Sequence, residues 1–201
     1  MTGIQPINHY NAPKRVKLAA AVGAGVGVAT ALYGLTKGNL KSFNKIHYGF
    51  KEVMALGGGS ILGGLMGGIM VCENEDQARV KIREGYQQLV GGLLIPMGCV
   101  EIVNNIMKKT KINKIVQAAL SIGTMIATTF VGYKATDKIY NKLFNGTHEY
   151  QVEARDFLCD VDDVAYAASK GLNMPKLNQG IAWCMPFTYL TMGYKTGTRH
   201  T

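Results

Sequence analysis

The chain alternates between long stretches without a charged side chain and short clusters of charged residues. The charge-free stretches are 18–36, 53–72, 85–100 and 115–133. A helix needs about 20 mostly apolar residues to cross about 30 Å of hydrocarbon. A soluble bundle would show a polar stripe along each helix, and in the second stretch only Ser60 is polar. The pattern therefore predicts four transmembrane helices in two hairpins rather than a soluble bundle. With Glu101 included in the third, the predicted spans are 18–36, 53–72, 86–107 and 115–133.

The first span has two alternative interpretations. A basic flank precedes it, and Ala29-Thr30-Ala31 resembles the cleavage site of a signal peptide. The first acidic residue is Glu52, as in an organelle transit peptide, but only one Arg and one Ser come before it. Since the apolar run continues through Leu35 and fills a whole span, we expect a retained helix.

The spans divide the chain into three parts: an irregular leader at 1–15, a transmembrane domain at 16–144 and a C-terminal region at 145–201. The basic connection at 36–52 has a helical pattern over 40–50, so it is either an amphipathic interfacial helix or a plain basic loop. We expect a short polar helix at the hairpin tip, 73–84, and a fourth helix that continues beyond 133.

The C-terminal region combines an acidic helix with an aromatic segment. Residues 149–170 have a helical pattern with acidic positions on one face, which fits a solvated or docked surface. The segment 181–194 is rich in aromatic residues and is interrupted by Pro186, which suits an interfacial or re-entrant segment better than a crossing. The expected interface anchors are Trp183, Phe187 and Tyr189.

Charge is distributed unevenly. Residues 1–148 hold 17 Lys and Arg against 7 Asp and Glu, whereas 149–201 hold 5 against 6. Because the basic residues flank the spans, we assign them to anionic lipid headgroups and not to nucleic acid. The expected location is integral to a membrane, and the expected partner is the lipid bilayer.

Glycine recurs at a regular spacing in the first two spans. Small residues four apart make a flat helix face on which a second backbone can pack closely, and seven glycines occur in 53–72. We expect close helix packing there, within the chain or in a homo-oligomer. The glycines that define these faces are Gly23, Gly27, Gly59, Gly63, Gly67, Gly64 and Gly68.

Glu101 is the one charged residue inside a predicted span, and Asn104 and Asn105 follow it. An intramembrane carboxylate is by default a functional hypothesis, such as a proton or cation site. The alternative is that the span ends near Val100 and that Glu101 lies among the headgroups.

No arrangement of residues carries enzyme chemistry. The four cysteines show no paired spacing, and the four histidines match no zinc or nucleophile motif. Gly57-Gly58-Gly59 lacks the lysine of a phosphate-binding loop. We therefore expect no catalytic residue, cofactor or metal.

The glycine-rich, four-span pattern over 16–133 resembles the mitochondrial inner-membrane translocase family. The loop signature of that family has an Arg, an Asp four residues on and then a glycine pair. Glu84 and Gly91-Gly92 have the mutual spacing of the last two parts, but Val80 stands where the signature has Arg. We do not assign the chain to the family. The function expected from the sequence is a structural or assembly role, and the alternative is a channel or transporter that uses Glu101.

Overall fold

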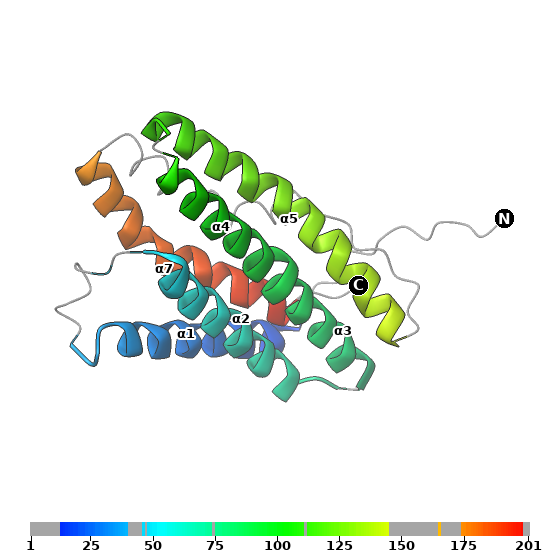
Figure 1. Cartoon of the computed structure of the whole chain (residues 1–201). Helices are drawn as coiled ribbons and strands as arrows, with labels where there is room; N and C mark the ends of the chain where they lie inside the picture. The colour runs from blue at the N-terminus through cyan, green and yellow to red at the C-terminus, as the bar shows by residue number, and fades with distance from the viewer. Residues whose placement is uncertain are drawn as a thin grey trace.

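The computed structural model of the chain describes residues 13–39, 46, 48–73, 75–110, 112–144, 165 and 174–198. Every regular element among these residues is a helix (Figure 1). The prediction of an all-helical chain with four helices long and apolar enough to cross a membrane is confirmed. These four are Lys14–Leu35, Phe50–Met70, Glu75–Met107 and Lys114–Leu143.

The first two long helices, α1 (Lys14–Leu35) and α2 (Phe50–Met70), run antiparallel. The helix α1 is followed by a turn in which Gly38 has a φ of 77°, a conformation that favours glycine, and its N–H donates to the carbonyl of Tyr33. At the start of α2 the Glu52 carboxylate accepts a hydrogen bond of 3.1 Å from the N–H of Gly49. This bond satisfies one of the amide groups that precede the helix.

The third long helix consists of α3 (Glu75–Tyr86), the π-helical η2 (Gln87–Leu94) and α4 (Ile95–Lys109), joined without a break. The expected short helix at the hairpin tip is therefore the beginning of this helix, not a separate element. The wide π-helical turns of η2 come directly before Pro96. Proline has no N–H to donate, and in a regular α-helix its ring would clash with the carbonyl four residues back. There the N–H of Ile95 bonds to the carbonyl of Val90, five residues back.

The helix α5 (Lys114–Phe144) returns along α4 and η2 and continues well beyond 133, as the sequence predicted. The last described helix, α7 (Pro175–Thr198), is continuous through Pro186. The segment predicted to be interfacial or re-entrant is thus not broken at Pro186, and α7 is not among the four helices apolar enough to cross a membrane. The helix is held against α1 and α2 by the packing of Met185, Tyr189 and Met192 into the core, which overrides the helix-breaking tendency of proline.

The core lies where α1, α2, η2 and α7 meet. Its fully buried members include Leu56 and Ile61 of α2, Leu93 of η2 and Met185 of α7. The helix α5 contributes no residue to this core and packs mainly on α4 and η2. Figure 1 shows α7 alongside α2 and α5 on the far side of α4.

The directions of the helices follow from their contacts. The helices α2 and α7 are parallel, because Gly193 contacts Ser60 and, one turn further along both helices, Gly197 contacts Gly64. The helix α5 is antiparallel to α3–η2–α4, and that helix is antiparallel to α2. The helices α5 and α7 therefore run in the same direction, and α5 ends at the end of the bundle opposite to the start of α7 (Figure 1).

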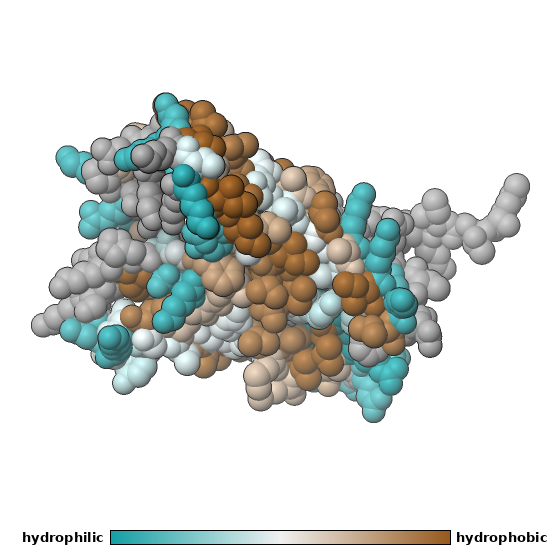
Figure 2. Space-filling model, viewed as in Figure 1, coloured by the Kyte–Doolittle hydropathy of each residue, from teal (hydrophilic) through white to brown (hydrophobic). Residues whose placement is uncertain are grey.

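Large apolar side chains cover much of the outer surface. Figure 2 shows an apolar band across the middle of the molecule and hydrophilic residues toward its two ends. A surface of this kind is expected where a helix faces lipid. Exposed members of this surface include Leu18, Val22 and Val26 of α1, Leu62 and Met66 of α2, and Ile126, Phe130 and Val131 of α5.

Two predicted elements fall on residues that the structure does not describe. The acidic helix at 149–170 lies outside the described residues except for Ala165. The interfacial helix or loop at 40–50 lies mostly outside them. Of that segment, Ile46, Tyr48 and Gly49 are described and are not helical, and Phe50 begins α2.

Candidate functional site

The contact between α1 and α2 joins two backbones through glycine. A Cβ placed on Gly23 would overlap the carbonyl oxygen of Gly63, and a Cβ on Gly63 would overlap that of Gly23. One turn along, a Cβ on Gly59 would lie 2.8 Å from the carbonyl oxygen of Gly27. We call this set the α1–α2 glycine contact. It comprises Gly23, Gly27, Gly59, Gly63 and Gly67, the last of which lies against Ala19.

The second glycine register of α2, one position further on, faces a different helix. A Cβ on Gly64 would overlap the backbone of Gly193, and a Cβ on Gly68 would lie 3.0 Å from the Cα of Gly197. The hydroxyl of Ser60 donates to the carbonyl of Tyr189. Adjacent registers on one helix thus pack on α1 and α7, and we call the second set the α2–α7 contact. The spacing of Gly193 and Gly197 in the sequence could have predicted it.

A third close approach joins η2 to α5. A Cβ on Gly91 would lie 3.1 Å from the backbone carbonyl of Gly132 and 2.7 Å from the hydroxyl oxygen of Thr136. The neighbouring Gly92 lies against the hydroxyl of Tyr133. The glycine pair that follows Glu84 in the sequence therefore admits both the backbone of α5 and one of its side chains.

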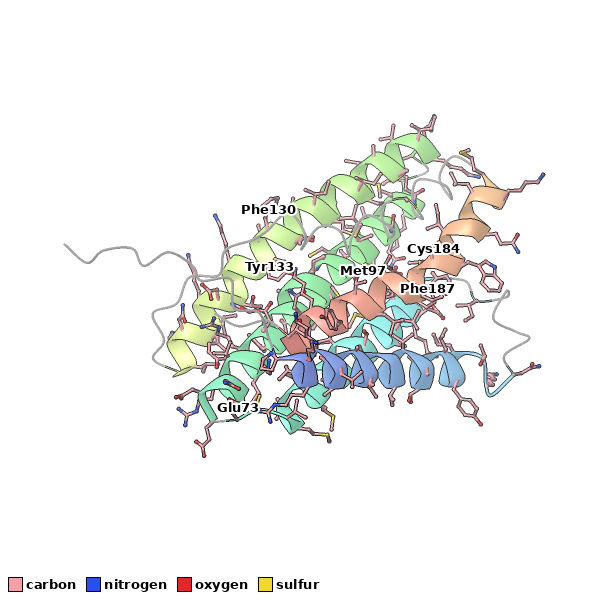
Figure 3. All side chains as sticks on the ribbon, turned by 180° about the vertical axis from the view of Figure 1, so that it is seen from behind. Glu73, Met97, Phe130, Tyr133, Cys184 and Phe187 are labelled. Atoms are coloured by element: carbon pink, nitrogen blue, oxygen red, sulfur yellow. The ribbon has the colours of Figure 1, made fainter. Side chains whose placement is uncertain are left out.

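Tyr133 belongs to a group of buried polar side chains between α3–η2 and α5. Its hydroxyl donates to Gln88 Oε1 at 3.0 Å, and Gln88 Nε2 donates to Glu84 Oε1 at 3.3 Å. Next to this chain, Gln87 Nε2 donates to Asp137 Oδ1 at 2.8 Å. Figure 3 shows Tyr133 on α5, on the side that faces the long helix formed by α3, η2 and α4. We call this group the polar network: Glu84, Gln87, Gln88, Tyr133 and Asp137.

Each member of the polar network is buried, and Gln87 is fully so. Among the described residues, Gln87 Oε1 has no hydrogen-bond partner. Buried polar groups are almost always hydrogen-bonded, because an unmade bond costs about 1–3 kcal/mol. Sequence reasoning missed the network, because the glutamines are uncharged and because both carboxylates lie just outside the predicted spans.

Lys81 adds a buried charge beside α7. Its side chain is fully buried, and Nζ donates to the carbonyl oxygen of Gly197 at 2.7 Å. That carbonyl lies in the last turn of α7, where helix carbonyls carry partial negative charge. The lysine therefore ties the end of α7 to α3.

Glu101, Asn104 and Asn105 do not form a single site. Asn104 faces α5, where its Oδ1 accepts a hydrogen bond of 2.8 Å from the hydroxyl of Ser121. Asn105 is exposed, and its Nδ2 donates to the half-buried Glu101 at 3.3 Å. All three lie on α4, whereas Gln87 and Gln88 of the polar network stand at the start of η2, the preceding part of the same long helix.

The three predicted interface anchors have different surroundings. Trp183 and Phe187 are 48% and 67% exposed, as side chains that contact lipid or headgroups would be. Tyr189 is only 1% exposed and packs in the core, so its assignment as an anchor is wrong. Phe187 and Tyr189 are two residues apart and therefore point to nearly opposite sides of α7, which buries the face of Met185, Tyr189 and Met192.

Candidate metal-binding residues are not grouped together in the described part of the chain. No group of three or more His, Cys, Asp or Glu side chains that could hold a metal ion occurs there. The described cysteines, Cys72, Cys99 and Cys184, are not paired with one another.

Comparison of the chain with protein-family models, with curated proteins and with solved structures found no match.

Proposed function

We propose that the chain is a multi-pass integral membrane protein with a structural or assembly role, based on close glycine-mediated helix packing. The α1–α2 glycine contact is the observation that carries this proposal. In lipid no hydrophobic force drives one helix onto another, so packing and Cα–H···O contacts have to hold helices together. In the α1–α2 glycine contact the carbonyls of one helix lie against the backbone of the other, which suits both close packing and Cα–H···O contacts.

The α2–α7 contact extends the same principle to a third helix. In α2 the two glycine registers pack on different neighbours, so the helix is held by backbone contacts on two faces. Such a unit is rigid because little flexible side chain separates the three backbones. The apolar exterior of α1, α2 and α5 then faces lipid or other membrane helices (Figure 2).

The proposed partners are the lipid bilayer, with its anionic headgroups, and a second copy of the chain. Exposed basic residues at both ends of the bundle, such as Arg15, Lys109 and Lys138, are placed to meet headgroups. The glycines of the α1–α2 contact are occupied within the chain, so an oligomer would use a remaining small-residue face. Gly25 of α1, with no atom within 4 Å of its Cβ position, lies on such a face. We propose no enzymatic activity and no nucleic-acid partner.

Alkaline carbonate washing of membranes that contain the chain tests its integration, and we expect the chain in the pellet. Recovery in the supernatant would refute the membrane proposal. Native gel electrophoresis in a mild detergent then tests assembly, with the chain expected in a complex larger than a single copy. A monodisperse single copy at every detergent concentration would argue against the assembly role but leave membrane integration intact.

A channel or transporter is the second candidate, as the sequence analysis proposed for Glu101. The burial of the polar network between α3–η2 and α5 favours it, because buried ionisable residues in membrane helices commonly mark ion or proton pathways. Flux of protons and small ions in proteoliposomes tests this candidate, with Glu84→Gln and Glu101→Gln beside the parent. Flux reduced by Glu84→Gln alone would place the pathway in the polar network, and flux reduced by Glu101→Gln alone would place it on α4. No flux above protein-free liposomes would exclude this function.

A further inference from the structure

One face of α5 is exposed along the whole length of the helix. Steps of three and four residues place its members on one side of the helix. Figure 3 shows Phe130, beside this face, on the outer side of α5. We call its apolar part the α5 stripe and its charged part the lysine row. The α5 stripe comprises Val116, Leu120, Gly123, Ala127 and Val131, and the lysine row that continues it comprises Lys134, Lys138 and Lys142, all of them exposed.

The lysine row has no counter-charge within the described part of the chain. The ion pairs there join Arg15 to Glu73 and Arg79 to Glu75. Asp137 is the one acidic residue of α5, but it is buried against η2, where it accepts a hydrogen bond from Gln87. Like charges four residues apart on a helix repel each other. The lysine row therefore favours an anion from outside the chain.

The helix dipole accounts for only part of the lysine row. Lys142 lies in the last turn of α5, where a basic side chain is stabilised by the partial negative charge of the last carbonyls. Lys134 and Lys138 lie before that turn, and the effect of the dipole falls off within it. The charges of these two lysines are thus left for a ligand to balance.

The lysine row begins at the depth expected for lipid headgroups. Lys134 is the first charged residue after the charge-free stretch 115–133, which is long enough to fill the hydrocarbon. Nearby, the ring of Tyr140 lies 6.2 Å from that of Tyr86, and tyrosine is enriched where membrane and water meet. An anion bound here would lie directly beside the α5 stripe, as the phosphate of a membrane lipid does beside its own acyl chains.

The α5 stripe leaves room for an acyl chain. Nothing lies within 4 Å of a Cβ placed on Gly123, and the small, exposed Ala127 follows one turn later. An acyl chain can therefore approach the helix closely at these two positions. Gly123 precedes Lys134 by 11 residues, or about 16 Å along the helix axis. This is close to the thickness of one leaflet, which is half of the about 30 Å of hydrocarbon.

We propose that α5 binds one anionic phospholipid, whose phosphate accepts hydrogen bonds from Lys134 and Lys138 and whose acyl chain lies along the α5 stripe at Gly123 and Ala127. A headgroup with a net negative charge fits this site. A zwitterionic headgroup fits it less well, because its own cation meets the lysines. The proposal assigns a specific lipid site to one face of the chain, and it rests on the proposed membrane integration.

Native mass spectrometry of the full chain in detergent tests the site, with equal amounts of phosphatidylglycerol and phosphatidylcholine of the same chain length. The test variant combines Lys134→Gln and Lys138→Gln. The matched control combines Lys109→Gln and Lys114→Gln, which removes two exposed lysines at the opposite end of α5. A third variant, Lys134→Arg with Lys138→Arg, keeps both charges. The unfolding midpoint of each variant checks that it folds, as expected for changes at exposed positions.

The parent is expected to retain phosphatidylglycerol in preference to phosphatidylcholine. This preference should fall about tenfold or more in the test variant, since each lysine near an anionic headgroup adds to the affinity. It should persist in the control and in the arginine variant. Equal losses in the test and control variants, or no preference in the parent, would overturn the site.

Two further results would also overturn the proposal. Displacement of the lipid by excess inorganic phosphate would show that the lysine row binds a free anion without an acyl chain. A dimer that carries no lipid, and that the test variant leaves unchanged, would assign this face to a second copy of the chain. Neither result changes the outcome of the carbonate wash, so failure of the lipid site is distinguishable from failure of the membrane proposal.

Discussion

The hydroxyl of Tyr133 occupies the space beside the Cα of Gly92 that a side chain would fill, and from there it donates to Gln88 Oε1 at 3.0 Å. The two residues belong to α5 and η2, so the absence of one side chain admits another from the facing helix. This pair links the backbone packing of the helices to the polar network, because the hydroxyl that lies against Gly92 is also the donor to Gln88.

Gly92→Ala should destabilise the chain by about 1–3 kcal/mol, because the added methyl group overlaps the Tyr133 hydroxyl. Thermal unfolding in detergent measures the effect. Gly98→Ala on α4 is the control, since nothing lies within 4 Å of its Cβ position. It should be neutral or stabilising through the better helix propensity of alanine. Equal effects of both substitutions would contradict the close approach.

Tyr133→Phe should also lower stability, by about 1–3 kcal/mol, because the buried hydrogen bond from the Tyr133 hydroxyl to Gln88 Oε1 is lost. Phe130→Tyr is a matched change on the same helix, since Phe130 is 44% exposed. The experiment compares unfolding midpoints of the two variants with the parent. An unchanged midpoint for Tyr133→Phe would show that the hydroxyl adds nothing to the network.

Gly63→Leu should separate α1 from α2, because any side chain at this position meets the carbonyl of Gly23. The expected loss is about 3 kcal/mol or more, at the upper end of the overpacking range. Gly34→Leu, at an open position near the end of α1, is the control. If Gly63→Leu unfolds at the same temperature as Gly34→Leu, the α1–α2 glycine contact is wrong.

Gly193→Ala should loosen α7, because its Cβ would overlap both the carbonyl and the hydroxyl of Ser60. We expect faster cleavage within 175–198 by a protease added to the detergent-solubilised chain. Gly180→Ala, on the same helix with nothing within 4 Å of its Cβ position, should be cleaved like the parent.

Arg15→Gln should change stability by less than about 1 kcal/mol. Arg15 forms an ion pair with Glu73, but both side chains are 56% exposed, and exposed pairs contribute little. Unfolding midpoints at low and high salt measure this contribution. A large, salt-sensitive loss would show that the pair holds the start of α1 to the end of α2.

The sequence predicted the spanning helices well, because the length of an apolar run determines whether it can cross a bilayer. It predicted the partners of those helices less well. The two registers of α2 were visible as Gly63 and Gly64, but spacing alone does not say which helix packs on each. Tyr189 was assigned to the interface by residue type, whereas its burial depends on the direction in which α7 packs.

The polar network shows a further limit. Gln87 and Gln88 carry no charge, and Glu84 and Asp137 lie near span ends, where carboxylates usually face water. Only the antiparallel alignment of α5 with α3–η2 brings positions 84–88 opposite 133–137. That alignment depends on contacts between residues about 50 positions apart, and no local pattern encodes it.

The shared direction of α5 and α7 has a consequence for how the chain is made. Neighbouring membrane helices commonly insert as antiparallel hairpins, but α5 and α7 cannot, because both run from the same end of the bundle to the other. The sequence between them, 145–174, carries six acidic residues, and acidic side chains are costly to carry through hydrocarbon. We therefore expect two stages of biogenesis, in which the four apolar helices insert first and α7 then packs beside α2 in a separate event.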